Sequence, residues 1–447
     1  MKNRAGRVIF ICALIHCWSS SQLIFCGATL VAADDFKKPA KPSLGGWPNW
    51  RGPNQDGVST DTGLVDSWAS GGPKKLWEQE LGGGYSSMVV SQGRLVTLSK
   101  RGTEETIECF DAWNGEPLWD VKYPGEYDQH PSLDERFKHS GPRSTPTVDG
   151  DRVYAIATTG MLRCLDLRSG KLIWKRDVLK MSGRQIQLFG YCSSPLILDD
   201  LLFLQPGGSP GKSIAAFNKS DGSTAWLEHD FPTGYATPLS IEHDGETQIV
   251  FFTGAAVVGV SPKDGRLLWQ YGWKTRQNQN IAAPIYSDGN LYISSATMHN
   301  PEGGVLLRLK KDANPDVVWK GRTMANWYAS SMLFDGHLFG FSGMRLRAVE
   351  FETGTRKWDQ MGMGQGSLVI ADGRLIVLSQ HGELVLAEAR ADEFKQLARW
   401  RAFEPPKQPV LLTAKYRGVF SVPVVASGIL YLRNQWLLIA IDLRKEA

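Results

Sequence analysis

The chain alternates short apolar, β-favouring runs with turns that contain glycine or aspartate along most of its length. Eight segments each begin with small residues and continue as an apolar run, a turn and a second apolar run, which is the pattern of a β-hairpin. A third apolar run follows in several copies, as in IECFD at 107–111 and MLRCLD at 161–166. The eight segments are 85–98, 143–156, 192–204, 235–252, 281–294, 328–341, 365–378 and 420–432.

A second motif places a turn-rich stretch, usually with glycine, shortly before a tryptophan, as in DAWNGEPLW at 111–119. A worn copy, EARADEFKQLARW, ends the series, and the first tryptophan has no such stretch before it. The spacing averages about 46 residues, which is typical of repeat proteins, and four antiparallel strands in each period predict the blade of a β-propeller. The blade tryptophans are Trp77, Trp119, Trp174, Trp226, Trp269, Trp319, Trp358 and Trp400.

The turn between the third and fourth strands needs a residue that tolerates positive φ, and glycine supplies it in five copies, as at Gly115 and Gly222. We expect each tryptophan to lie on an outer strand and to fill the wedge between neighbouring blades. The segment 437–447 supplies a third strand without a tryptophan, whereas Trp77 marks an outer strand without a third strand. Pairing of strand 76–80 with strand 437–442 would close a ring of eight blades, or of seven if 384–400 is an embellishment.

The N-terminal segment has the features of a secretory signal peptide. Lys2, Arg4 and Arg7 precede the apolar run 8–15, and small residues stand before a cleavage site after Ala33. The apolar run is too short for a membrane anchor, and no small residue precedes Cys17 or Cys26 as a lipoprotein signal would require. We therefore expect a signal peptide over 1–33, an extension over 34–70 and a propeller over 71–447, without a transmembrane span after cleavage.

Composition and charge narrow the classes of partner. The formal net charge is only +4, which does not indicate a nucleic-acid-binding protein. Cleavage of the signal would leave three cysteines, Cys109, Cys164 and Cys192, so no complete disulfide framework is expected. Because of the signal peptide, we expect the protein in the periplasm, in the cell envelope or outside the cell.

Repeats of the form D-x-x-[S/T/N/D]-G-x-x-x-W in an eight-bladed ring resemble the quinoprotein-type, or PQQ-like repeat, propellers. That family includes pyrroloquinoline quinone (PQQ) alcohol dehydrogenases and non-enzymatic BamB-like propellers of bacterial outer-membrane assembly. The likeness covers about residues 71–447, and WPNWRGPNQDGVS at 47–59 is similar to the opening segment of many secreted PQQ-like repeat proteins. This likeness predicts the fold specifically, but it says little about the chemical activity, because enzymes and scaffolds share the fold.

The residues do not match the catalytic pattern that the resemblance implies for the dehydrogenases. Those enzymes typically hold PQQ between a tryptophan and a disulfide of adjacent cysteines, beside a Ca²⁺ ion and an aspartate base. This chain has no adjacent cysteines, and Cys109 and Cys164 occupy equivalent positions in successive blades, where we expect buried thiols. The histidines, including His130, His139, His299 and His381, lack the spacing of a metal site. The segment PGGSPGKS at 206–213 resembles a phosphate-binding loop, but no helix is expected after it. No catalytic residue, metal site or cofactor is expected, and PQQ with Ca²⁺ remains the alternative.

One register of residues, three positions before the proline of the hairpins or the position equivalent to it, is predicted to surround one mouth of the central channel. Aromatic side chains and one arginine at this mouth could bind a planar or polymeric ligand, or they could simply fill the opening and support the long loops. Tyr191, which precedes Cys192, is also a candidate. The register contains Tyr85, Arg143, Cys192, Tyr235, Ile281, Tyr328, Gln365 and Phe420.

Long connections reach this same mouth from the outer strands, at 120–142, 176–191 and 401–419. Because long loops on a rigid scaffold often carry function, we expect a partner surface here. The sequence thus favours a monomeric, non-catalytic scaffold that binds an envelope or extracellular protein. The alternatives are a PQQ-dependent alcohol or polyol dehydrogenase and a propeller that binds a small ligand or polysaccharide.

Overall fold

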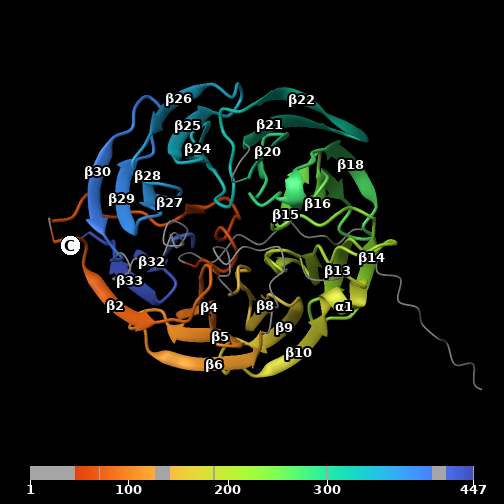
Figure 1. Ribbon diagram of the computed structural model, residues 1–447, viewed down its shortest axis with the longest axis horizontal. Helices are drawn as coiled ribbons and strands as arrows, with labels where there is room; N and C mark the ends of the chain where they lie inside the picture. The colour runs from red at the N-terminus through yellow and green to blue at the C-terminus, as the bar shows by residue number, and fades with distance from the viewer. Residues whose placement is uncertain are drawn as a thin grey trace, which may run out of the picture. The chain divides into compact units, whose positions relative to one another are not determined.

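The computed structural model describes residues 46–69, 71–125, 141–184, 187–297, 301–404 and 419–445, and the predicted signal peptide lies outside them. Residues 38–447 form one compact unit. In it, eight four-stranded antiparallel blades surround a common axis, as predicted (Figure 1). In the described residues, no helix combines the length and the apolar character that a membrane crossing requires.

The first four blades run from the innermost to the outermost strand in chain order. Blade 1 contains β3 (Val89–Ser91), β4 (Arg94–Arg101), β5 (Glu104–Asp111) and β6 (Pro117–Pro124). Blade 2 contains β7 (Thr147–Asp149), β8 (Arg152–Ile156), β9 (Met161–Asp166) and β10 (Leu172–Asp177), which is followed by the short helix α1 (Val178–Ser182). Blade 3 contains β11 (Leu196–Leu198), β12 (Leu201–Leu204), β13 (Ile214–Asn218) and β14 (Thr224–Glu228). Blade 4 contains β15 (Leu239–His243), β16 (Glu246–Phe252), β17 (Ala256–Val260) and β18 (Leu267–Gly272).

The next three blades repeat this order, and the worn repeat forms a complete blade 7, so the seven-bladed alternative is wrong. Blade 5 contains β19 (Ile285–Ser287), β20 (Asn290–Ala296), β21 (Pro301–Lys310) and β22 (Ala313–Gly321), after the 3-10 turn η2 (Arg276–Asn278). Blade 6 contains β23 (Met332–Phe334), β24 (His337–Ser342), β25 (Arg345–Glu350) and β26 (Arg356–Gln360). Blade 7 contains β27 (Ser367–Ala371), β28 (Arg374–Leu378), β29 (Glu383–Glu388) and β30 (Gln396–Arg401).

Blade 8 joins the two ends of the propeller, as predicted. It contains β31 (Val424–Ala426), β32 (Ile429–Arg433), β33 (Leu437–Asp442) and, as its outer strand, β2 (Lys75–Glu80). Trp77 pairs with Ala440 in the antiparallel β2–β33 ladder. Arg433, which is fully buried, reinforces the closure by donating to Thr97 Oγ1 and the Leu98 carbonyl of blade 1, both at 2.8 Å. The ring therefore closes without leaving blade 8 an unpaired third strand.

Tryptophans of the outer strands join successive blades. The Trp174 indole Nε1 donates to the Lys219 carbonyl of the next blade at 3.1 Å. The indole also covers Gly222, where a Cβ would lie 2.6 Å from Trp174 Cε3. Comparable indole-to-carbonyl bonds of 2.8–3.1 Å are made by Trp77, Trp119, Trp226, Trp319 and Trp358. The repeated phrase thus encodes both halves of a contact, a tryptophan on one blade and a turn on the next.

Two tryptophans depart from this arrangement. Trp269 bonds Gln248 Oε1 of its own blade at 2.7 Å, because the β21–β22 turn of blade 5 is a tight hairpin that lacks the glycine. In blade 7 the longer turn moves the register, so that Ala398 and not Trp400 occupies the tryptophan position opposite β29. Trp400 lies two residues further along and packs near Gly72. The other six follow the predicted role.

The segment that precedes the propeller crosses the inner ends of several blades. Trp47 exchanges backbone hydrogen bonds with Val90 of β3, and the Pro48 carbonyl accepts from Val148 of β7. β1 (Val58–Ser59) then pairs in parallel with β27, on the other side of the axis. Because these contacts lie at the ends of the innermost strands, the segment covers one end of the central channel.

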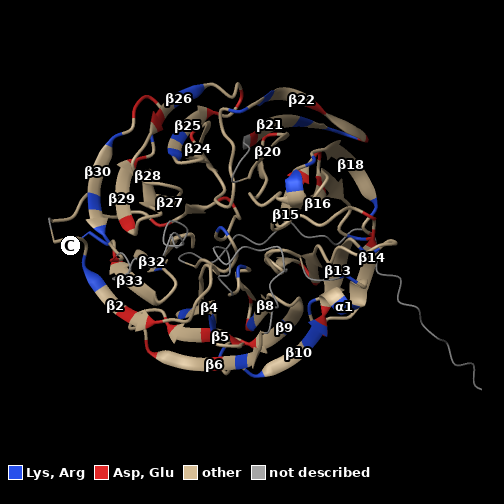
Figure 2. Cartoon of the chain, viewed as in Figure 1, with Lys and Arg blue, Asp and Glu red and all other residues tan. Residues whose placement is uncertain are grey.

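Charged residues lie mainly on outer strands and turns, whereas the inner strands are almost free of them (Figure 2). Glu105 on β5 is an exception, since it is fully buried and accepts a hydrogen bond from the Thr158 backbone N–H of blade 2 at 3.2 Å. Within the described residues it forms no ion pair. Burial raises the pKa of the Glu105 carboxyl above its usual value.

We predict that Gly222→Ala destabilises the propeller more than Gly336→Ala. Both glycines have positive φ, +73° and +70°, so both substitutions cost backbone strain, but only a Cβ at 222 collides with an indole. The additional loss should be about 1–3 kcal/mol, the usual cost of overpacking. Denaturant unfolding measures it, and equal losses would contradict the interblade role of the glycine.

We also predict that Glu105→Gln stabilises the protein at pH 7. Since the folded-state pKa of Glu105 is raised, the folded state favours the protonated carboxyl, and wild-type stability falls as pH rises above the unfolded value of about 4.3. The gain should disappear below about pH 4, where both states are protonated. Melting temperatures of the two proteins measured from pH 3.5 to 8 test this, and a gain that is independent of pH would contradict it.

Candidate functional site

The two ends of the channel differ in the connections that they carry. Each chain enters its innermost strand at one end, where the long connections and the turns between second and third strands also lie; we call this the entry face. The glycine turns between third and fourth strands lie at the opposite end, together with the segment that contains Trp47; we call this the turn face. Most of connections 120–142 and 401–419 lies outside the described residues.

The predicted register brings aromatic rings from several blades together at the centre of the entry face. Phe420 contacts both Tyr85 and Tyr328, with ring centroids 5.7 and 4.6 Å away. Tyr328 also contacts Trp327 at 5.3 Å, and its hydroxyl donates to the Gln365 carbonyl at 3.0 Å. Blades 6, 7, 8 and 1 are therefore connected through these side chains.

Arg143 extends this contact chain into the following blades. Its guanidinium carbon lies 5.4 Å from the centre of the Tyr85 ring and 5.9 Å from that of Phe189. Its Nη1 donates to the Phe189 carbonyl at 3.0 Å, and Phe189 meets Tyr235 edge-on at 5.7 Å. We call the set Trp327, Tyr328, Phe420, Tyr85, Arg143, Phe189 and Tyr235 the aromatic chain.

The members of the register differ in accessibility. Tyr235 and Tyr191 are each only 5% exposed, so they support the mouth from below its surface. Tyr85, Arg143, Tyr328, Gln365 and Phe420, like Cys192 and Ile281, are half-buried. Trp327 and Phe189 were not predicted, because they precede the register in connections whose path the repeat does not determine. Aromatic residues just before each entry strand are the signal that could have identified them.

Hydroxyl side chains two positions after the register form a second inner feature. The Ser87 backbone N–H donates to Thr145 Oγ1, Thr145 N–H to Ser194 Oγ, and Ser194 N–H to Thr237 Oγ1, at 2.9–3.0 Å. Ala283 N–H donates in the same way to Ser330 Oγ at 2.9 Å. These bonds explain the small residues of each hairpin, and they also explain why the sheet of blade 1 begins only at Val89.

The described titratable residues do not form a metal-binding cluster. Among them, no three His, Cys, Asp or Glu side chains gather closely enough to hold a metal ion, while His130, His139 and His299 lie outside the description. Cys109, Cys164 and Cys192 are free thiols. Burial raises the pKa of Cys109 to about 12 and those of Cys164 and Cys192 to about 11, which makes the thiols unreactive near neutral pH.

Among the described residues, the rings of the aromatic chain do not form a slot for a planar quinone such as PQQ. A planar cofactor needs two facing surfaces with a slot between them, but the rings of the aromatic chain meet each other at 43–66° in direct contact. Arg143, the cation nearest to the rings, is already bonded to backbone carbonyls. The described residues therefore leave no slot between these rings.

Comparison with known proteins links the repeats to outer-membrane assembly factors. A family model described as "Outer membrane protein assembly factor BamB" matches residues 103–299. BamB of Salmonella typhimurium (strain LT2) is 27% identical over 160 residues, 34% of each chain. BamB of Yersinia pestis is 24% identical over 242 residues, 49% of this chain and 55% of that protein. The chain thus spans about a third to a half of the curated relatives that it matches.

Solved structures share the fold over most of the chain. BamB from Moraxella catarrhalis aligns with a TM-score of 0.59 at 12% identity, covering 83% of this chain and 99% of that one. Quinohemoprotein alcohol dehydrogenase from Comamonas testosteroni aligns with a TM-score of 0.64 at 11% identity, covering 90% and 81%. At these identities the structural likeness concerns the fold alone. The chain is thus an eight-bladed propeller that shares its fold with these structures, and its residues 103–299 are similar to the BamB family.

Proposed function

We propose that the protein is a non-catalytic, monomeric scaffold of the bacterial cell envelope, which binds a protein partner on its entry face. The observation that carries this proposal is the aromatic chain. Because its rings and Arg143 contact one another across the blades, the centre of the entry face is a continuous surface and not an open cleft. A rigid surface of this kind suits a macromolecular partner.

The sequence relatives support the envelope part of the proposal, since those matched are outer membrane protein assembly factors. A secretory signal over 1–33 would deliver the protein to the same compartment. We do not extend the dehydrogenase activity of the structural neighbours to this chain, because that likeness concerns the fold alone and the aromatic chain does not fit the cofactor.

Exposed apolar side chains on the entry face offer contact points for a partner. Met344 is 63% exposed in the β24–β25 turn, and Met361, 58% exposed, follows β26 in the same blade. Trp436, 46% exposed, lies in the β32–β33 turn of blade 8. Methionine and tryptophan are both favoured at protein interfaces, because methionine adapts its shape and tryptophan provides a large contact area.

We expect the purified protein not to bind PQQ. Addition of PQQ with Ca²⁺, followed by removal of free cofactor, should leave no stoichiometric quinone absorbance, because the rings at the entry face contact one another. The same sample should not reduce a redox dye in the presence of alcohols. Retention of one PQQ per chain would instead favour the dehydrogenase function.

We expect photo-crosslinking to mark the entry face as the partner surface. A photoreactive amino acid in place of Trp436 should give a discrete covalent adduct in the envelope fraction of producing cells, identified by mass spectrometry as an envelope protein. The matched control replaces Trp113, which is 51% exposed in a turn of the turn face. Since both indoles are similarly exposed, they differ mainly in the face that presents them.

Met344→Ser and Met361→Ser together should reduce the yield of the Trp436 adduct severalfold without lowering the melting temperature, since exposed side chains contribute little to stability. Adducts from position 113 alone, or equal adducts from both positions, would contradict the assignment of the face. Arg143 and Tyr235 are less suitable for this purpose, because Tyr235 is buried and Arg143 holds the Phe189 connection.

A further inference from the structure

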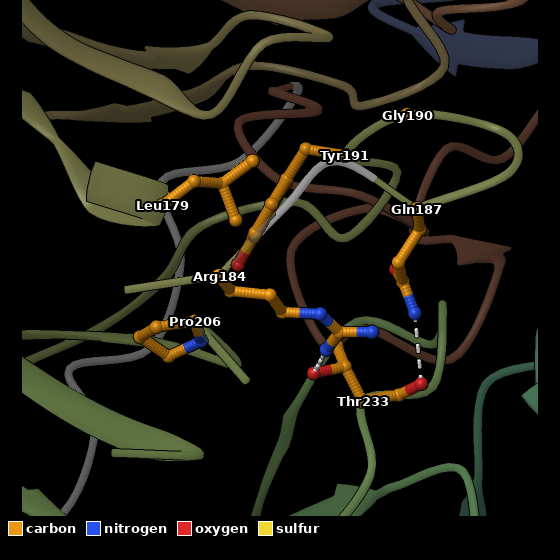
Figure 3. A pocket seen from close by; sticks show the side chains of 7 residues that line it. All are labelled: Leu179, Arg184, Gln187, Gly190, Tyr191, Pro206 and Thr233. Carbon is orange, nitrogen blue, oxygen red and sulfur yellow. Dashed lines mark hydrogen bonds between the residues drawn. The ribbon is translucent and has the colours of Figure 1, made fainter. Parts of the chain in front are cut away.

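A small cavity lies on the entry face (Figure 3). Its lining residue Gly190 follows Phe189 of the aromatic chain directly in sequence. It is formed where the connection after α1 meets the β12–β13 loop and the segment that enters β15. Its volume of about 10 Å³ is room for about one water molecule, or for the tip of a side chain from a partner. The lining residues are Leu179, Arg184, Gln187, Gly190, Tyr191, Pro206 and Thr233.

Arg184 brings a positive charge to this cavity, and the described residues place no carboxylate against it. Its Nη1 donates to Thr233 Oγ1, and its guanidinium lies between Tyr191 and Thr233, with Gln187 beside it (Figure 3). No carboxylate forms an ion pair with Arg184 among the described residues. The described side chains whose electrostatic interaction raises the pKa of the guanidinium are Tyr235 and Tyr191. Half-burial lowers the pKa of the guanidinium by desolvation, so the charge has lost solvation, and no ionic partner among the described residues offsets this loss.

Tyr191 contributes a second donor. Its ring is 5% exposed, and its hydroxyl lies beside the Gln205 backbone N–H, while the hydroxyl hydrogen has no acceptor in the described structure. Burial raises the pKa of the Tyr191 phenol well above its usual value, so the group stays protonated at physiological pH. A buried donor without an acceptor is uncommon in native proteins, and an acceptor on a bound molecule would satisfy it.

The backbone around the cavity is shaped to keep these donors together. Gly207, with φ of +70°, lies so close to Arg184 Nη1 and Thr233 Oγ1 that a Cβ there would overlap both. Gln187 Nε2 donates to the Thr233 carbonyl at 2.9 Å and fixes the other side of the cavity. The β12–β13 loop therefore packs directly against the pair that holds the guanidinium.

We propose that this cavity binds a carboxylate carried by a protein segment, an acidic side chain or a C-terminal carboxyl group, of the partner that docks on the entry face. This inference rests on the proposed scaffold function. A planar guanidinium offers two parallel N–H donors to the two oxygens of a carboxylate, and the Tyr191 hydroxyl adds a third donor. A flat carboxylate places its two oxygens in one plane with these parallel donors, and competition with inorganic phosphate tests this preference.

Two peptides that differ in one charge test this proposal. Acetyl-Gly-Glu-Gly-amide should bind the full chain, measured by ligand-observed NMR, and acetyl-Gly-Gln-Gly-amide should bind at least tenfold more weakly. A Gly-Gly-Gly peptide with a free C-terminus tests the terminal carboxyl group, and sodium acetate tests a small carboxylate without a chain. Binding of the glutamate peptide should decrease as its carboxyl protonates below about pH 4 and should be constant from pH 6 to 9.

Three variants assign the binding to the cavity. Arg184→Gln should weaken binding of the glutamate peptide at least tenfold, and Tyr191→Phe, which keeps the buried ring, should weaken it about threefold to tenfold. Arg276→Gln is the matched control, because Arg276 is an exposed arginine in another connection of the same face, and its affinity should equal that of wild type. Unchanged melting temperatures show that the variants are folded.

Several results would overturn the proposal. Equal binding of the glutamate and glutamine peptides would exclude carboxylate recognition, and equal competition by inorganic phosphate would exclude selectivity for the flat group. Acetate that binds as tightly as the peptides would assign the cavity to a free small acid instead of a protein segment. If Arg184→Gln abolishes peptide binding but leaves the Trp436 adduct intact, the scaffold function stands and the cavity is not part of the docking contact.

Discussion

The structure depends above all on the contact between an outer-strand tryptophan and the turn of the following blade. Each blade buries one face only when its neighbour is in place, and the indole fills the space that opens as blades diverge from the axis. The Trp174 Nε1 bond to the Lys219 carbonyl and the packing over Gly222 show the contact in full. Where the following blade has a different turn, as in blade 5, the Trp269 indole bonds Gln248 of its own blade instead.

Closure of the ring makes this local contact cooperative. β2 supplies the fourth strand of blade 8, and the buried Arg433 donates to the Leu98 carbonyl and Thr97 Oγ1 of blade 1. Both ends of the propeller are therefore joined at blade 8. At the axis, hydroxyls such as Thr145 Oγ1 and Ser194 Oγ accept backbone N–H groups of the preceding blade. The loops of the entry face are therefore mounted on a scaffold whose blades cannot move independently.

The two faces of the propeller therefore differ in what they offer to a binding partner. The turn face is occupied by short turns and by the segment from Trp47 to β1, which holds strands on both sides of the axis. The entry face combines the aromatic chain with exposed apolar groups such as Trp436 and with the Arg184 guanidinium, which has no carboxylate partner among the described residues. Apolar contact area supplies affinity and a positioned charge supplies specificity, which is the combination that protein recognition uses.

The sequence by itself determined the fold, because a propeller is a local pattern repeated: the four-strand period, the turn glycines and the two incomplete ends predicted eight blades and the β2–β33 closure. It also identified the register of the entry face. Only the tertiary structure decided that Tyr235 is buried, that Phe189 reaches back to Arg143, and that Ala398 replaces Trp400 in its register. The cavity of Arg184 and Tyr191 could not be predicted from the sequence either. Three connections form it, and their paths depend on packing between blades and not on the repeat.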